Sequence, residues 1–274
     1  MQASQPDKSS SGLLPRALAA LVMAPPVLLA LYFGSPYLDL LVYAGLAILA
    51  AEWALLCDHQ KKSVVLAVIL VGTLASLFAL RQLGTEPGLG VLAVSAALVT
   101  LIGQRVGGSP RLLFLGSVYL PMACFSFLWL RGQPEGLALA FWVMTAVWAT
   151  DVGAYAAGRG IGGPKLLPSI SPKKTWAGLL GGMAASGTVS LIAGLLVEPW
   201  DPLALLVLGA LLAVVAQAGD FLESGIKRYF GVKDASHLIP GHGGLLDRVD
   251  GLLMASLGVA ALVYLLRDAG HGWL

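Results

Sequence analysis

Long apolar runs, separated by short polar segments, follow one another along almost the whole chain. Each run is about 20 residues long, the length of helix that crosses the hydrocarbon core of a bilayer. Because a backbone in lipid must satisfy its hydrogen bonds internally, we expect these runs to form membrane-spanning helices. The expected spans are residues 17–34, 36–57, 63–82, 89–104, 111–130, 136–158, 175–197, 203–226 and 250–267. The pattern predicts an all-α, polytopic integral membrane protein with about nine transmembrane helices.

Composition and charge agree with this pattern and add an orientation. Hydrophobic residues make up 57% of the 274 residues and charged residues 12%, and the mean hydropathy is +0.82. When the connections are assigned to alternate sides of the membrane, only Arg81, Arg131 and Arg267, out of 17 lysines and arginines, fall on the second side. Cytoplasmic loops are the ones rich in Lys and Arg, so the amino terminus is predicted inside and the carboxyl terminus outside. The net charge of +2 gives no support for nucleic-acid binding.

The chain contains two cysteines, Cys57 and Cys124, at different expected depths in the membrane. They do not have the spacing of a zinc site, and their positions disfavour a disulfide. We expect both to serve in packing.

Acidic residues occur inside four of the apolar runs. A charged side chain near the bilayer centre costs about 2.5–3.5 kcal/mol on insertion scales, so each needs a partner, a watery cavity or a cation. One of these acids, Asp151, has Tyr155 one helical turn later on the same face. The acids that stand out are Glu52, Asp151, the pair Asp220 and Glu223, and the pair Asp247 and Asp250 at the opening of the last run.

The last two spans place several of these acids where they can meet. Asp220, Glu223, Ser224 and Lys227 follow the spacing i, i+3, i+4, i+7, which puts them on one stripe of a helix. Asp247 and Asp250 stand at the start of the next helix, where free backbone N–H groups tolerate carboxylates. Hard cations such as Mg²⁺ take carboxylate oxygens together with water and phosphate. The alternative is a structural network in which the acids pair with Lys227, Arg228 and Arg248.

The connection between these spans, KDASHLIPGHGGLLDR, is rich in glycine. Gly243 and Gly244 permit a sharp backbone turn whose N–H groups can cradle anionic oxygens, and Lys233 and Arg248 add positive charge. Two histidines, at 237 and 242, flank the turn, but the sequence offers no Ser or Cys nucleophile with a base and an orienting acid. A phosphate and metal site is therefore favoured over acyl transfer.

A second basic segment, GPKLLPSISPKKT, precedes the expected span 175–197. Basic residues beside a membrane often fix topology or contact anionic lipid head groups. The alternative is anion binding, because charged and hydroxyl donors here suit phosphate oxygens. The candidate donors are Ser171, Lys173, Lys174 and Thr175.

The stretch from Ser224 to Asp250 resembles the signature of the phosphatidate cytidylyltransferases, also called CDP-diacylglycerol synthases. The matching positions are Ser224, Lys227-Arg228, Lys233-Asp234, Ser236, Pro240, His242-Gly243-Gly244, Asp247-Arg248 and Asp250. The resemblance extends upstream to Asp220 and Glu223, to Ser171–Thr175 and to Asp151–Arg159, with Glu52-Trp53 as a faint match. Ala177 departs from the pattern, since many members have an acid there.

The resemblance implies transfer of a cytidylyl group from CTP to phosphatidic acid, giving CDP-diacylglycerol and pyrophosphate, with Mg²⁺ and a homodimeric membrane fold. A second cation is left open. Carried over by position, the metal ligands are Asp220, Asp247 and Asp250, with Lys227 and Arg248 as further catalytic residues. The implied substrate-binding residues are Ser171, Lys173, Lys174, Thr175, Ser224, Arg228, Lys233, His242, Gly243 and Gly244.

The expected spans and the resemblance together divide the chain into three parts. These are a cytoplasmic tail (1–15), an amino-terminal membrane region of about five spans (16–135) and a catalytic membrane region of about four spans (136–274). It implies a bacterial-type inner membrane, with the site facing the cytoplasm. The main alternative is a cation-coupled transporter, which also uses intramembrane acids but predicts inverted repeats and acids near the midplane. A phosphotransferase of the CDP-alcohol class fits less well, because Asp250-Gly251 is followed by Leu-Leu-Met-Ala.

Overall fold

The computed structural model of the chain describes residues 24–57, 63–232, 236 and 243–268. The long helices are α2 (Tyr37–Cys57), α3 (Ser63–Gln82), α4 (Thr85–Arg105), α5 (Pro110–Arg131), α6 (Gly136–Gly160), α7 (Trp176–Leu196), α8 (Pro202–Tyr229) and α9 (Leu246–Asp268). A shorter apolar helix, Ala24–Phe33, precedes α2. Within the described residues, eight helices are long and apolar enough to cross a membrane. The predicted all-α, polytopic membrane architecture is confirmed.

Eight of the nine expected spans correspond to these eight helices. The first expected span, 17–34, is represented by Ala24–Phe33, and its beginning lies outside the described residues, as does the tail 1–15. The total of nine spans therefore stays a prediction. Cys57 and Cys124 are both buried, in keeping with a packing role.

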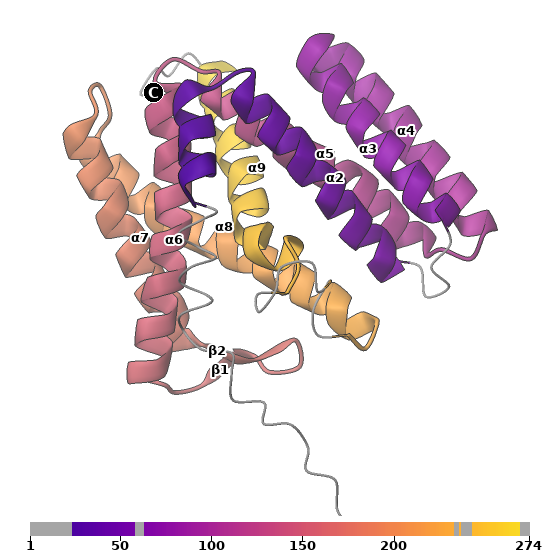
Figure 1. Ribbon diagram of the computed structural model, residues 1–274. Helices are drawn as coiled ribbons and strands as arrows, with labels where there is room; N and C mark the ends of the chain where they lie inside the picture. Colours follow the sequence, from indigo (N-terminus) through magenta and orange to yellow (C-terminus); the bar gives the residue numbers. More distant parts are fainter. Residues whose placement is uncertain (1–23, 58–62, 233–235, 237–242, 269–274) are drawn as a thin grey trace, which may run out of the picture.

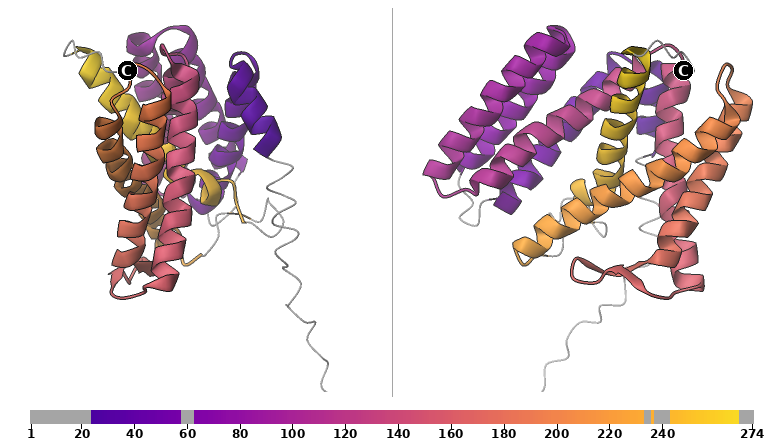
Figure 2. Two further views of the ribbon diagram at one scale, coloured as in Figure 1. Left: turned by 90° about the vertical axis from the view of Figure 1, so that its left-hand side faces the viewer. Right: turned by 180° about the vertical axis from the view of Figure 1, so that it is seen from behind.

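The helices form two groups joined by α9. Figure 1 shows α9 in the middle, with α2 to α5 on one side and α6 and α7 on the other, while α8 runs obliquely beneath α9. The right-hand view of Figure 2 shows the same oblique course of α8 from behind. Helix α9 contacts α5, α6 and α8, so it packs against both groups. The end of α8 and the start of α9 therefore lie where the two groups meet.

A short antiparallel hairpin joins α6 to α7. Strand β1 (Lys165–Leu167) pairs with β2 (Ser171–Thr175), with Lys165 opposite Thr175 and Leu167 opposite Ser171. The hairpin lies at the same end of the bundle as the start of α9, and the end of α9 lies at the opposite end (Figure 1). The segment that the sequence singled out as basic thus lies on the side of the two acid-bearing helix ends.

Small residues let α8 and α9 approach closely at this end. A Cβ placed on Gly219 would lie 2.5 Å from the carbonyl oxygen of Asp250, and one on Gly251 would lie 3.3 Å from a carboxylate oxygen of Asp220. Glycine at a helix crossing allows backbones to come together where larger side chains would separate them. The crossing brings the acid of one helix beside the acid of the other.

Candidate active site

Five carboxylates from three helices gather at the crossing of α8 and α9. We call them the acidic cluster: Asp151 on α6, Asp220 and Glu223 on α8, and Asp247 and Asp250 on α9. Asp250 interacts electrostatically with Asp151, Asp220 and Glu223, and Glu223 also contacts Asp247. The helical spacing predicted from the sequence is therefore confirmed for Asp220 and Glu223, which face α9.

Lysines from two different segments pair with the cluster. Lys174, in β2, forms an ion pair with Asp220, and its Nζ lies 4.8 Å from the centre of the Phe221 ring. On α8, Lys227 forms an ion pair with Asp247, and its Nζ lies 3.1 Å from Glu223 Oε1. The latter contact has the distance of an ion pair but not the geometry of a hydrogen bond.

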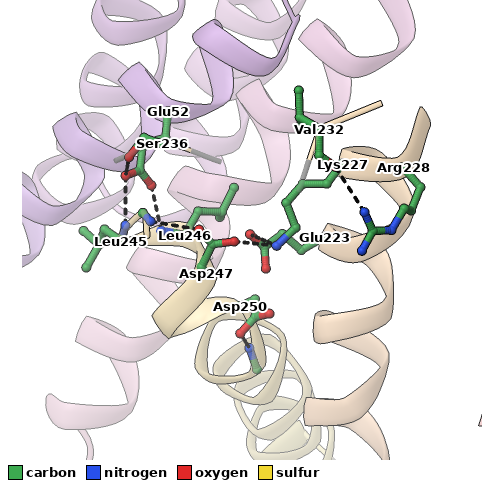
Figure 3. Close-up of polar contacts among 12 residues, drawn as sticks. Glu52, Glu223, Lys227, Arg228, Val232, Ser236, Leu245, Leu246, Asp247 and Asp250 are labelled. Carbon is green, nitrogen blue, oxygen red and sulfur yellow. Dashed lines mark hydrogen bonds and ion pairs between the residues drawn. The ribbon is translucent and has the colours of Figure 1, made fainter. Parts of the chain in front are cut away.

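These contacts are shielded from solvent to different degrees. The side chains of Lys227, Glu223 and Asp247 are 12%, 5% and 10% exposed, whereas those of Lys174 and Asp220 are 24% and 22% exposed. Charges attract more strongly where water is excluded, but the cost of removing them from water is also larger. The Lys227 group is thus the buried part of the site, and the Lys174–Asp220 pair is its more accessible part. Figure 3 shows the amine of Lys227 beside the carboxylates of both Glu223 and Asp247.

A pocket of about 220 Å³ opens beside the Lys174–Asp220 pair. It lies between α6, the hairpin, the start of α7 and α8, and its polar lining consists of Asp151, Tyr155, Lys173, Lys174, Thr175, Gln217 and Asp220. Two larger hollows, of about 430 and 400 Å³, have no charged residue in their linings. Because convergent charged groups mark a functional pocket better than volume does, the smaller pocket is the candidate site.

The start of α9 is held by backbone hydrogen bonds to carboxylates. Asp247 accepts from the N–H of Gly244 at 2.8 Å, and Gly243 has a φ of 82°, which favours glycine. Glu52 of α2, which is only 2% exposed, accepts from the Leu245 and Leu246 N–H groups at 2.8 and 2.7 Å. Unpaired N–H groups at a helix start need such acceptors.

The remaining predicted site residues occupy varied positions. Thr175 is buried and caps α7, its Oγ1 accepting from the Gly178 N–H at 3.0 Å. Arg228 is exposed and donates to the Val232 carbonyl at 3.4 Å. Lys173 and Arg248 are exposed, and Arg248 interacts electrostatically with Asp151. Ser171 and Ser224 are half-buried. The predicted residues Lys233 and His242, together with His237, lie outside the described residues.

Only two of the three predicted metal ligands lie side by side. Asp250 lies beside Asp220, whereas Asp247 pairs with Lys227 further along α8. Among the described residues, no group of three or more His, Cys, Asp or Glu side chains is arranged to hold a metal ion. Any magnesium ion would therefore need water or substrate oxygens to complete its shell. Magnesium binding stays a prediction.

Three residues of this arrangement are absent from the site predicted from the sequence. Asp151, Glu223 and Glu52 were noted as acids in apolar spans and as positions within the family resemblance, but none was assigned a role in the site. The expectation that each acid needs a partner pointed to the site correctly, because each has partners around the α8–α9 crossing. The approach of α2 to the start of α9 could not be predicted from the sequence.

Comparison with known proteins agrees with this geometry. A phosphatidate cytidylyltransferase of Brucella melitensis biotype 1 is 43% identical over 179 residues, which are 65% of this chain and 64% of the relative. One from Pseudomonas aeruginosa is 36% identical over 260 residues, covering 91% of this chain and 96% of the relative. One from Bacillus subtilis is 38% identical over 141 residues, covering 51% and 52%.

The model of the cytidylyltransferase family matches residues 14–266, which include every helix described above except the last two residues of α9. The resemblance noted in the sequence between Asp151 and Asp250 thus extends over nearly the entire chain. The chain belongs to the cytidylyltransferase family.

Proposed function

We propose that this protein transfers the cytidylyl group of CTP to phosphatidic acid, forming CDP-diacylglycerol and releasing pyrophosphate. The observation that carries the proposal is the convergence of Lys174, Asp220 and Asp250, from three separate segments, beside one polar pocket. Phosphate groups need cationic donors such as Lys174. The pocket lies at the end of a membrane-spanning bundle, where a lipid head group and a soluble nucleotide can both arrive.

The acidic cluster supports a role for magnesium. Within the described part of the chain, its five carboxylates interact with three cationic side chains, Lys174, Lys227 and Arg248. When all are ionised, two negative charges remain uncompensated, and burying unpaired charge is costly. One divalent cation supplies that charge, and carboxylate oxygens are the ligands that Mg²⁺ prefers. We propose that Asp220 and Asp250 hold Mg²⁺, with Asp247 as a further candidate ligand.

The chemistry requires little proton transfer from the protein. A phosphate monoester has a second pKa of about 6 and is largely a dianion near neutral pH, so an oxygen of phosphatidic acid can attack without a strong base. A bond forms between this oxygen and the α-phosphorus of CTP, and the bond from the α-phosphorus to the bridging oxygen breaks. Pyrophosphate leaves with the electron pair.

The main task of the protein is to bring two anions together. Lys174 is placed to offset phosphate charge in the pocket, and Lys227 keeps Asp247 and Glu223 in position. Bound Mg²⁺ would stabilise the charge that develops on the phosphate oxygens.

The proposal is tested by incubating the purified protein with CTP, phosphatidic acid and Mg²⁺ and measuring pyrophosphate. We expect release only when both substrates are present. Pyrophosphate release that ignores phosphatidic acid would mean simple CTP hydrolysis. If folded protein releases no pyrophosphate, the proposed activity is wrong.

The two lysines of β2 have different surroundings, and this gives a prediction for substrate affinity. Lys174→Ala should raise the KM for one substrate about tenfold, because a charge-assisted hydrogen bond contributes about 1.5–3 kcal/mol. Lys173→Ala should have a smaller effect, since its exposed side chain is screened by water. Steady-state kinetics with each substrate varied in turn will measure both.

The control for this pair is Lys165→Ala, which removes an exposed lysine from the neighbouring strand. Its kinetics should stay within about twofold of the parent, as is usual for surface substitutions. Equal KM values for Lys174→Ala and Lys165→Ala would indicate that Lys174 has a purely structural role.

A second prediction concerns the metal. Chelation by EDTA should abolish activity, and Mg²⁺ should restore it. Asp220→Asn should raise the Mg²⁺ concentration for half-maximal activity at least about tenfold, since altering even an outer partner of a metal ligand costs 10–100-fold in affinity. A Mg²⁺ titration identical to that of the parent would exclude Asp220 as a ligand.

The environment and assembly follow the same proposal. Bacterial relatives and the distribution of basic residues support an inner-membrane protein whose pocket faces the cytoplasm, where CTP is found. We also propose a homodimer. The family match argues against the cation-coupled transporter suggested by the intramembrane acids.

A further inference from the structure

Glu52 makes an unusual set of contacts for a residue in a membrane-spanning helix. It lies on α2, in the amino-terminal half of the chain, and its side chain reaches the start of α9 nearly 200 residues later (Figure 3). Oε1 accepts from the Ser236 hydroxyl at 2.6 Å and from the Leu245 N–H at 2.8 Å, while Oε2 accepts from the Leu246 N–H at 2.7 Å. The carboxylate is thus bonded through both oxygens.

The close fit leaves little freedom at this point. A Cβ placed on Gly244 would lie 2.7 Å from Glu52 Oε1 and 3.0 Å from its Cδ and Oε2. The next residue of α2, Trp53, is 1% exposed, and its Nε1 donates to the Leu112 carbonyl of α5 at 2.9 Å. Glu52 therefore connects the start of α9 to a buried part of the amino-terminal helices.

The bonded loop is the one that positions Asp247. Gly244, whose N–H donates to Asp247, stands directly before Leu245 and Leu246, whose N–H groups donate to Glu52. Two carboxylates thus accept hydrogen bonds from three consecutive backbone N–H groups. We infer that Glu52 is a positioning residue, which fixes the start of α9 and thereby the positions of the glycine turn and of Asp247, the candidate cation ligand. This inference rests on the proposed function.

Both acceptor oxygens are required by the chemistry of the partners. The two backbone groups can only donate, so a glutamine at this position must turn its NH₂ group toward one of them. One buried N–H then faces another donor and loses its partner. The Ser236 hydroxyl can rotate to accept, but a backbone N–H cannot. Glu52→Gln therefore keeps the size of the side chain and breaks the arrangement.

The test compares Glu52→Gln with the parent, using the amount of folded protein from size-exclusion chromatography to normalise the rates. We expect kcat/KM for CTP to fall about 100-fold, because a displacement near 1 Å at a reacting centre costs about that much. The KM of the substrate whose binding Lys174→Ala weakens should stay within twofold, since the Lys174 pocket is untouched. A purely structural role would lower the yield of folded protein and leave both kinetic constants unchanged, which would overturn the inference.

Hydrogen exchange gives a second measurement that needs no activity. Peptides containing Leu245 and Leu246 should exchange their amide hydrogens faster in Glu52→Gln than in the parent, while peptides from β2 should not change. Equal exchange in the two proteins would contradict the inference, even where the activity has fallen. If the parent protein is inactive, the proposed function is contradicted, but hydrogen exchange still tests whether Glu52 fixes the start of α9.

Two further variants complete the design. Glu86→Gln removes an exposed carboxyl from the first turn of α4 and should match the parent in rate and exchange. Ser236→Ala removes one of the three contacts and serves where Glu52→Gln does not fold. It should lower kcat/KM for CTP several-fold and leave unchanged the KM of the substrate whose binding Lys174→Ala weakens. An unchanged kcat/KM in Ser236→Ala would then overturn the inference.

Discussion

Replacing Asp247 by asparagine is expected to lower the rate of CDP-diacylglycerol formation about 10³-fold, the upper range for removal of one group that stabilises a charged transition state. Asparagine keeps the shape of the side chain and can still accept from the Gly244 N–H. It loses the negative charge opposite Lys227, and with it a candidate oxygen ligand for a cation. The measurement is the initial rate per folded molecule at saturating CTP and phosphatidic acid.

The fold should survive this change, because Lys227 keeps its contact with Glu223. The matched control is Asp268→Asn, which makes the same chemical change at the other end of α9, on an exposed side chain. Its rate should equal that of the parent. An Asp247→Asn rate within tenfold of the parent would show that Asp247 takes no direct part in the reaction.

Lys227→Met is expected to destabilise the protein by about 3–5 kcal/mol, the cost of breaking a buried ion pair by removing one partner. The substitution leaves Glu223 and Asp247 in contact with each other and without the cation between them. We expect the midpoint of thermal unfolding to fall by roughly 10 °C. The measurement is thermal unfolding of the detergent-solubilised protein.

Two comparisons separate charge from size in this experiment. Arg228→Met alters the neighbouring, exposed residue of α8 and should change the midpoint little. Adding Glu223→Gln to Lys227→Met removes one of the two uncompensated charges and should recover part of the lost stability. A double variant less stable than Lys227→Met would mean that repulsion between the carboxylates is not the cause.

The sequence predicted the helices well because hydropathy reports directly on burial in lipid. The expected span 63–82 coincides with α3. The two helices at the site differ from expectation at their polar ends: α8 continues past residue 226 to Tyr229, and α9 begins at Leu246 rather than 250. Apolarity cannot delimit a helix whose end carries functional charges. The hairpin was not expected, because strands of three and five residues give almost no periodic signal.

The site was predicted in part. Spacing along one helix correctly placed Asp220 and Glu223 on a common face, because helical geometry is local. The partner of each acid depends on how helices cross, which spacing does not specify. Asp250 rather than Asp247 therefore lies beside Asp220, Lys174 pairs with Asp220, and Glu52 reaches α9 from a distant helix.

The most direct test follows the phosphorus atoms of CTP. The protein is placed in bilayers containing phosphatidic acid and given CTP labelled at either the α- or the γ-phosphorus, with Mg²⁺. We expect the α label to enter a lipid, CDP-diacylglycerol, and the γ label to appear in pyrophosphate. An α label that stays entirely in water-soluble products, from protein shown to be folded, would contradict the proposed transfer.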